Sequence, residues 1–160
     1  MVEAKPVYKV IGICGSLRKD STNLSVLKLI PTLNASIQLE IVYYADVPLY
    51  NGDVEAATGV PDSVKAIAAK IAEADGVYIA CPEYNYSVPG VLKNLIDWIS
   101  RIQPGVLNKK PVAIFSVAAG NPGGARAQYD LRKIFVFFNA LVLAAPEVQI
   151  GANYLNKFND

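Results

Sequence analysis

Residues 77–98 read VYIACPEYNYSVPGVLKNLIDW, and this stretch decides the fold. A short apolar run at Val77–Cys81 is typical of a buried strand. A polar loop with two prolines and a glycine follows at Pro82–Gly90, and a helical pattern then continues to Trp98. In an open α/β sheet, ligands bind in the loops beyond the carboxyl ends of the strands. Because this loop is more elaborate than a bare connection requires, we interpret it as a ligand-binding loop.

The composition limits the class of protein. The chain has 160 residues, of which 52% are hydrophobic and 18% charged, with a formal net charge of +1. We expect one domain, residues 1–160, that buries its own core. The near-neutral charge argues against nucleic acid or an anionic membrane as a partner. The most apolar segment, Ile134–Ala145, has roughly half the ~20 residues of a membrane span, and no signal peptide is recognised. We therefore expect a soluble, cytoplasmic protein.

The absence of histidine limits the chemistry. It excludes Ser-His-Asp and Cys-His catalysis and removes the commonest metal ligand. The two cysteines, Cys14 and Cys81, end apolar runs without motif spacing, so we interpret them as buried, inert thiols. Any reaction is then expected to use carboxylates, Lys, Tyr or a bound cofactor. We assign no catalytic side chain and no metal.

Strand and helix patterns alternate along the chain. Strands are predicted at residues 9–14, 37–43, 76–81 and 111–117, with a last one within 141–150. Helices are predicted over 21–30, closed by Pro31, from Pro61 past Ile71, after the loop to about Ile102, and around 131–138. Residues 45–59 are predicted to be a long connection. Five short strands alternating with helices predict a parallel sheet covered on both faces, which is a three-layer α/β domain.

The first predicted strand leads into GSLRKDSTN, residues 15–23, just before a helix. Hydroxyls, a carboxamide, two cations and free helix amides gather there, and such donors attract a phosphate. The alternative is that Ser21 or Thr22 only caps the helix, while Arg18 and Lys19 are solvated. We favour a site for one terminal phosphate, because the P-loop pattern and the third glycine of the dinucleotide fingerprint are missing.

The later loops are predicted to seat a planar ring. Backbone amides of Pro82–Gly90 and the Asn85 amide are expected at the edge of a flat heterocycle, with Tyr84 and Tyr86 as aromatic walls. The glycine-rich loop Ala118–Gly124, after the fourth predicted strand, allows its backbone to approach the same ligand. We interpret Glu83 as structural, or as contributing through its main chain, rather than as a general acid or base.

These motifs resemble those of the NAD(P)H-dependent FMN reductases, the flavodoxin-like quinone, azo-dye and chromate reductases. Three stretches in the expected order carry the resemblance: Gly15–Asn23, Pro82–Trp98 and Gly123–Arg132. The resemblance implies a flavodoxin-like three-layer sandwich, a five-stranded parallel sheet in the order 2-1-3-4-5, and FMN at the switch point between strands one and three. Family members usually carry a further C-terminal helix. This chain stops soon after the fifth predicted strand, so we expect that last helix to be missing and one sheet face to be incompletely covered.

The resemblance also assigns the cofactor contacts. It places the FMN phosphate at Ser16, Arg18, Ser21 and Asn23, the isoalloxazine at Pro82, Glu83, Tyr84, Asn85 and Tyr86, and its other side at Ser116 and Gly120. The expected reaction is hydride transfer from NADPH or NADH through FMN to a quinone-like or other small acceptor. The alternative is a flavodoxin-type electron carrier, or a flavin-binding sensor, without efficient NAD(P)H turnover.

Assembly into a homodimer or homotetramer is expected, as is common among relatives. The helix around Phe135–Phe138 has more aromatic surface than one buried face requires, which favours oligomerisation. Arg126, Tyr129, Glu147 and Tyr86 are hypothesised to form a polar cluster near a subunit interface. The alternative is that they are separate surface groups.

Overall fold

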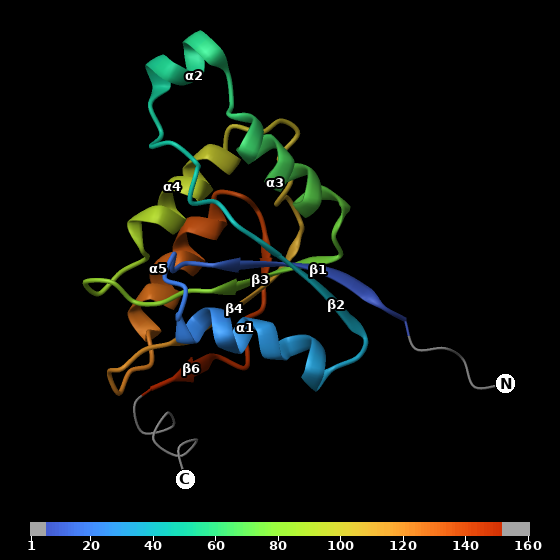
Figure 1. The fold of residues 1–160 in the computed structure, drawn as a ribbon, viewed down its shortest axis with the longest axis vertical. Helices are drawn as coiled ribbons and strands as arrows, with labels where there is room; N and C mark the ends of the chain where they lie inside the picture. The colour runs from blue at the N-terminus through green and yellow to red at the C-terminus, as the bar shows by residue number, and fades with distance from the viewer. Residues whose placement is uncertain (1–5, 152–160) are drawn as a thin grey trace, which may run out of the picture.

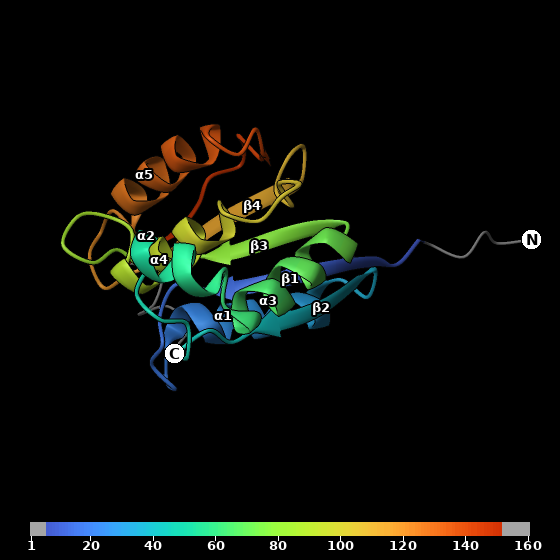
Figure 2. The ribbon, with the colours of Figure 1, turned by 90° about the horizontal axis from the view of Figure 1, so that it is seen from above.

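The computed structural model describes residues 6–151, in which parallel strands form a sheet between layers of helices (Figure 1). The elements are β1 Tyr8–Cys14, α1 Thr22–Leu33, β2 Ile37–Val42, α2 Gly52–Thr58, α3 Asp62–Glu73, β3 Gly76–Ala80, α4 Gly90–Ile99, β4 Pro111–Val117, α5 Ala125–Val136, β5 Leu141–Val142 and β6 Val148–Ile150. The strand order is β2-β1-β3-β4-β5, with β6 also paired to β4. Figure 2 shows β2, β1, β3 and β4 side by side in this order. The flavodoxin-like fold and the order 2-1-3-4-5 are therefore confirmed.

The sheet separates two apolar cores because side chains alternate along each strand. In β3, Val77 and Ile79 face the larger core, which is built with α3, α4 and α5. Tyr78 and Ala80 face the other side, where α1 packs through the fully buried Leu27. Figure 1 shows α1 below the strands and α3 and α4 above them. Strands buried on both faces have continuous apolar sequences, which is why the pattern identified them.

The last predicted strand is formed by two short strands. β5 pairs with the beginning of β4, at Pro111 and Leu141, whereas β6 pairs with its end, at Val117 and Ile150. The residues between β5 and β6 leave the strand ladder. They include Pro146, which has no amide hydrogen to donate to a neighbouring strand.

Two predictions about helices are wrong. α1 does not end before Pro31 but continues to Leu33. Pro31 lies in the last turn, where its missing amide removes one hydrogen bond, and the Asn34 amide still donates to Ile30 O at 3.1 Å. The predicted connection over residues 45–59 contains α2, which Asn51 caps at its N-terminus. No residue of α2 is buried, so no apolar periodicity reveals the helix.

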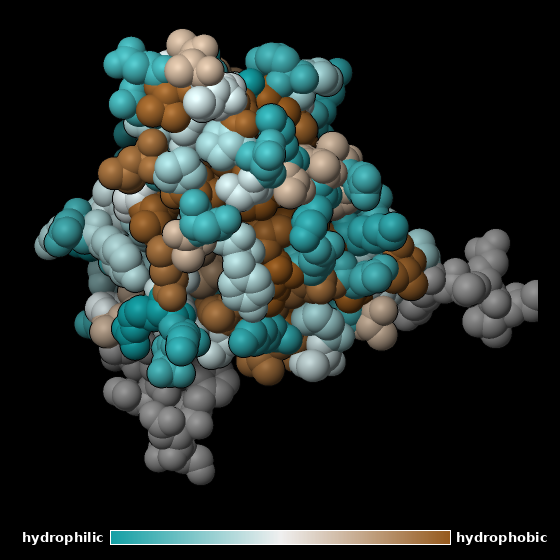
Figure 3. Space-filling view, turned by 45° about the horizontal axis from the view of Figure 1, so that its top comes forward, coloured by the Kyte–Doolittle hydropathy of each residue, from teal (hydrophilic) through white to brown (hydrophobic). Residues whose placement is uncertain are grey.

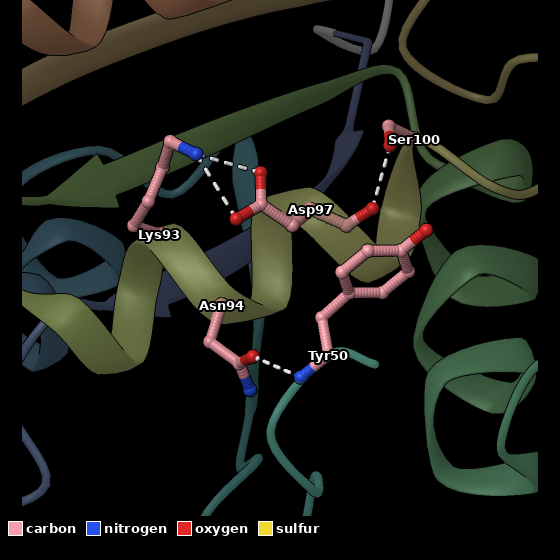
Figure 4. Close-up of polar contacts among 5 residues, drawn as sticks. All are labelled: Tyr50, Lys93, Asn94, Asp97 and Ser100. Carbon is pink, nitrogen blue, oxygen red and sulfur yellow. Dashed lines mark hydrogen bonds and ion pairs between the residues drawn. The ribbon is translucent and has the colours of Figure 1, made fainter. Parts of the chain in front are cut away.

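The connection before α2 is fastened to α4. The Asn94 side chain accepts a hydrogen bond from Tyr50 N at 2.8 Å (Figure 4) and donates one to Pro48 O at 2.9 Å. Trp98 is fully buried, and its indole Nε1 donates to Pro48 O at 2.8 Å. The Tyr50 ring meets the Trp98 ring edge-on, with centroids 5.0 Å apart. Trp98 therefore packs α4 against the connection that precedes α2.

Apolar surface remains open beside α1. A groove of about 560 Å³ runs along that sheet face and is lined by side chains that include Tyr8, Tyr78, Ala113 and Leu143. The expectation that a last helix is missing falls on residues 152–160, which lie outside the described residues. On the face drawn in Figure 3, apolar side chains likewise reach the surface between polar ones. Within residues 6–151, no helix is both long and apolar enough to span a membrane.

Candidate FMN site

Three loops meet at the carboxyl ends of β1, β3 and β4 and border a cavity of about 310 Å³. β1 and β3 are neighbours whose following helices, α1 and α4, pack on opposite faces of the sheet. This is the switch point at which open α/β sheets bind ligands. Of the predicted contacts, the cavity is lined by Ser16, Arg18, Ser21, Asn23, Pro82, Glu83 and Tyr84. Four others do not line it: Asn85, Tyr86, Ser116 and Gly120.

The loop after β1 presents donors to this cavity. Ser21 caps α1, with its Oγ accepting from Leu24 N at 3.4 Å, so the helix begins at the cavity wall. The Ser16 hydroxyl lies 3.1 Å from the Tyr84 hydroxyl. This contact joins the loop after β1 to the loop Pro82–Gly90 after β3, which we call the ring loop. Arg18 is exposed, and within residues 6–151 it takes part in no ion pair. Its guanidinium, the hydroxyls and the first amides of α1 form a donor set suited to a phosphate.

Asn23 has a structural contact that the sequence did not reveal. The residue is only 2% exposed. Asn23 Nδ2 donates to Val117 O at 2.7 Å, and Val117 N donates back to Asn23 Oδ1 at 3.0 Å. The carboxamide therefore joins the start of α1 to the end of β4. Its predicted contact with the FMN phosphate stays a prediction.

The ring loop after β3 is a tight hairpin. Tyr84 and Ser87 exchange two backbone hydrogen bonds of 3.0 and 3.1 Å. The residues between them, Asn85 and Tyr86, have φ values of 49° and 69°, which lie in the left-handed region. Asn is common in such a turn, but the second position favours glycine, so Tyr86 adopts a costly conformation there. This exposed ring is held in place by contacts outside the hairpin.

The glycine-rich loop after β4 is held from beneath by a buried polar network. Ser116 is fully buried, and its hydroxyl donates to Gly123 O while it accepts from Gln128 Nε2 at 2.7 Å. Gln128 Nε2 also donates to Val148 O at 2.8 Å. Ser116 thus fixes the loop from below, and its predicted contact with the flavin remains untested. Gln128 was missed as a positioning residue, although a lone amide on the apolar face of a helix was a visible signal.

The four residues of the hypothesised polar cluster lie in two separate pairs. The Arg126 guanidinium carbon sits 4.1 Å from the centre of the Tyr86 ring. The Tyr129 hydroxyl lies 3.1 Å from Glu147 Oε2 and donates to it. The structure thus brings Arg126 to the ring loop and leaves the other pair apart from it.

Ionisation around the site follows burial and hydrogen bonding. Burial raises the pKa of the Cys81 thiol to about 12, and both cysteines are buried and free, which confirms that prediction. Burial also raises the pKa of Tyr44, whose hydroxyl donates to Cys14 O at 2.7 Å. Hydrogen bonds from Ser87 and from Lys133 lower the pKa of Asp130. Among residues 6–151, no group of three His, Cys, Asp or Glu side chains is placed to hold a metal ion.

Phosphate donors after β1 and a ring loop after β3 define a flavodoxin-like class of proteins that bind a mononucleotide at the switch point. Comparison with known families narrows this class. Residues 8–154 match the family described as NADPH-dependent FMN reductase, and the chain belongs to that family.

Individual relatives agree with the family assignment. The chain is 48% identical to a quinone reductase of Escherichia coli over 145 residues, which cover 89% of this chain and 77% of that protein. It is 42% identical to an NAD(P)H:quinone oxidoreductase of Solanum tuberosum over 153 residues, covering 93% and 78% of the two chains. Among solved structures, the flavoenzyme NAD(P)H:(acceptor) oxidoreductase FerB of Paracoccus denitrificans superposes with a TM-score of 0.82 at 34% identity, covering 90% and 79%.

Proposed function

We propose that this chain is a single-domain, FMN-dependent NAD(P)H oxidoreductase that reduces a quinone-like small molecule. One observation carries the proposal: the cavity of about 310 Å³ places the N-terminus of α1 and its phosphate donors opposite the ring loop. The donor set fits FMN because hydroxyls, a guanidinium and helix amides suit a single phosphate. The family and the relatives named above support the same chemistry.

The residues have separate roles in this proposal. Arg18, Ser16 and the first amides of α1 would hold the FMN phosphate. The segment Pro82–Tyr86 would hold the isoalloxazine, and the hairpin would fix its backbone donors. Bound FMN would supply the redox chemistry by taking a hydride from NADPH or NADH and passing electrons to the acceptor. The chain contributes binding and orientation, in agreement with the absence of histidine.

The proposal is tested by flavin binding and turnover. We expect FMN to bind, and anaerobic NADPH or NADH to bleach its visible absorbance, with colour returning when a quinone is added. Tight FMN binding without turnover would favour the electron carrier or sensor instead. No FMN binding would refute the site itself.

Matched variants test the phosphate contact. Arg18→Ala is expected to raise the Kd for FMN by roughly 10- to 100-fold, because a hydrogen bond to a charged group is lost. The same change is expected to leave the Kd for riboflavin, which lacks the phosphate, nearly unchanged. Lys19→Ala is the control, since Lys19 is the neighbouring cation but does not line this cavity. Equal losses in the two variants would contradict the assignment of Arg18.

We also propose that the protein acts in the cytoplasm as a homodimer or homotetramer. Exposed apolar side chains near the end of α5 support assembly: Val136 is 78% exposed and Phe137 is 77% exposed. Sedimentation analysis is expected to show the oligomer. A monomer at micromolar concentration would contradict this part of the proposal.

A further inference from the structure

Glu83 reaches from the ring loop to the start of α5. Its Oε2 accepts hydrogen bonds from Arg126 N at 3.1 Å and from Ala127 N at 3.4 Å. Its Oε1 lies 2.9 Å from Arg126 Nη1. The Glu83 side chain is only 13% exposed, so the carboxylate is largely enclosed by these partners.

α5 has no local cap, which explains why this contact matters. Its N-cap position is Gly124, which has no side chain to bond the first amides, and its first turn contains no acidic residue. The carboxylate of Glu83 meets both needs, since it accepts from those amides and places negative charge at the positive end of the helix. A cap from a loop more than 40 positions away therefore links the loop Pro82–Gly90, which borders the FMN cavity, to the start of α5.

The same carboxylate supports the strained hairpin indirectly. It anchors the Arg126 guanidinium, which lies over the ring of Tyr86, the residue at φ 69°. A second link runs from the far side of the hairpin, where Ser87 Oγ donates to Asp130 Oδ2 at 2.7 Å. The hairpin is thus fastened to α5 at both ends.

We propose that Glu83 is a positioning residue whose carboxylate, bound to the start of α5 and to Arg126, holds the ring loop in the shape that receives the flavin. The inference rests on the proposed function, because it concerns the same site. It assigns Glu83 no proton transfer. It also explains how a tyrosine is kept at a turn position that favours glycine.

The test uses Glu83→Gln, which preserves size and one acceptor oxygen but removes the charge. We expect the Kd values for FMN and for riboflavin to rise by the same factor, about tenfold, because charge-assisted bonds to the helix terminus and to Arg126 are weakened. Flavin fluorescence measures both constants. At saturating FMN, we expect the pH dependence of kcat to match that of wild type, because the proposal gives Glu83 no proton to transfer. Equal effects on the two flavins distinguish this variant from Arg18→Ala, which affects FMN alone.

Hydrogen exchange of the flavin-free protein gives a second, independent readout. In Glu83→Gln, the amides of Arg126 and Ala127 are expected to exchange faster than in wild type. The matched control is Asp97→Asn, which removes the ion pair with Lys93 on α4, where Nζ lies 2.7 Å from Oδ1 (Figure 4). This control is expected to change neither exchange at α5 nor flavin binding.

Several outcomes would overturn the proposal. These are unchanged flavin affinity in Glu83→Gln, a loss for FMN but not for riboflavin, or a hundredfold fall in kcat with altered pH dependence. If Glu83→Gln does not fold, Arg126→Ala replaces it, because it keeps the amide bonds and is expected to raise both Kd values by about threefold. If wild type binds neither flavin, the proposed function fails. In that case, hydrogen exchange of the Arg126 and Ala127 amides still tests whether Glu83 fastens the loop to α5. Equal exchange in Glu83→Gln and wild type would refute the positioning role of Glu83 as well.

Discussion

Asn23→Ala tests how the site is held together. The substitution removes the carboxamide that exchanges two hydrogen bonds with the backbone of Val117, at 2.7 and 3.0 Å. Asn23 is only 2% exposed and Val117 is 2% exposed, so the bonded groups are buried in the intact protein. The variant should therefore lose both hydrogen bonds and leave a buried N–H and a buried C=O unpaired.

The expected loss can be estimated group by group. Leaving one buried donor or acceptor unsatisfied costs about 1–3 kcal/mol, so two such groups predict a loss of about 2–6 kcal/mol in the free energy of unfolding. For a protein of this size, at about 2–4 °C per kcal/mol, that corresponds to a fall in Tm of roughly 4–24 °C. Asn23→Asp is not expected to restore stability, because it sets a carboxylate oxygen against the carbonyl of Val117.

Urea unfolding followed by circular dichroism measures this loss. Thr22→Ala is the control, since Thr22 is exposed in the same turn of α1 and its side chain makes no hydrogen bond within residues 6–151. The control is expected to stay within about 0.5 kcal/mol of wild type. A loss below about 1 kcal/mol in Asn23→Ala, or a loss equal to that of the control, would refute the reasoning.

Three further predictions concern the loops and the core. Gly124→Ala places a Cβ 2.7 Å from the Cβ of Ser116 at a φ of 89°, so we expect a stability loss of about 2–4 kcal/mol, and a loss below 1 would contradict the loop geometry. Trp98→Phe removes one of the two hydrogen bonds to Pro48 O and part of a fully buried ring, so thermal unfolding should show a loss of about 1–3 kcal/mol; an unchanged Tm would count against this packing. The raised pKa of Cys81 makes the free energy of unfolding depend on pH. The contribution of the protonated, buried thiol is complete below pH 9.0, the ordinary pKa, and is lost as the pH rises toward about 12. Cys81→Ala should therefore lose less stability than wild type between pH 9.0 and about 12. Equal slopes of the free energy of unfolding against pH in the two proteins would contradict the role of Cys81 in this decline.

Much of the architecture was predictable because apolar periodicity reports burial directly. β4 was predicted with the observed bounds, Pro111–Val117, since a strand buried on both faces has a continuous apolar sequence. α2 was missed for the converse reason, because none of its residues is buried. Pro31 was given too much weight, since the last turn still closes through the hydrogen bond from Asn34 N to Ile30 O although Pro31 has no amide hydrogen to donate.

The site was predictable only as a set of loops. The donors after β1 and the loop after β3 were found because their residue types are unusual for plain connections. Their partners were not found. Asn23 bonds to a residue 94 positions away, and Glu83 to one 43 positions away, so neither contact leaves a local pattern.

The sequence alone therefore determined the alternation of strands and helices, the absence of histidine chemistry, and the positions of the loops that border the site. Burial and the periodicities of helix and strand act locally, so they are visible along the chain. Only the tertiary structure decided that Asn23 clamps β4, that Ser116 supports the glycine loop, and that Glu83 caps α5. The physical reason is that each buried polar group must find a partner, and the packing of the sheet determines which partner lies within reach.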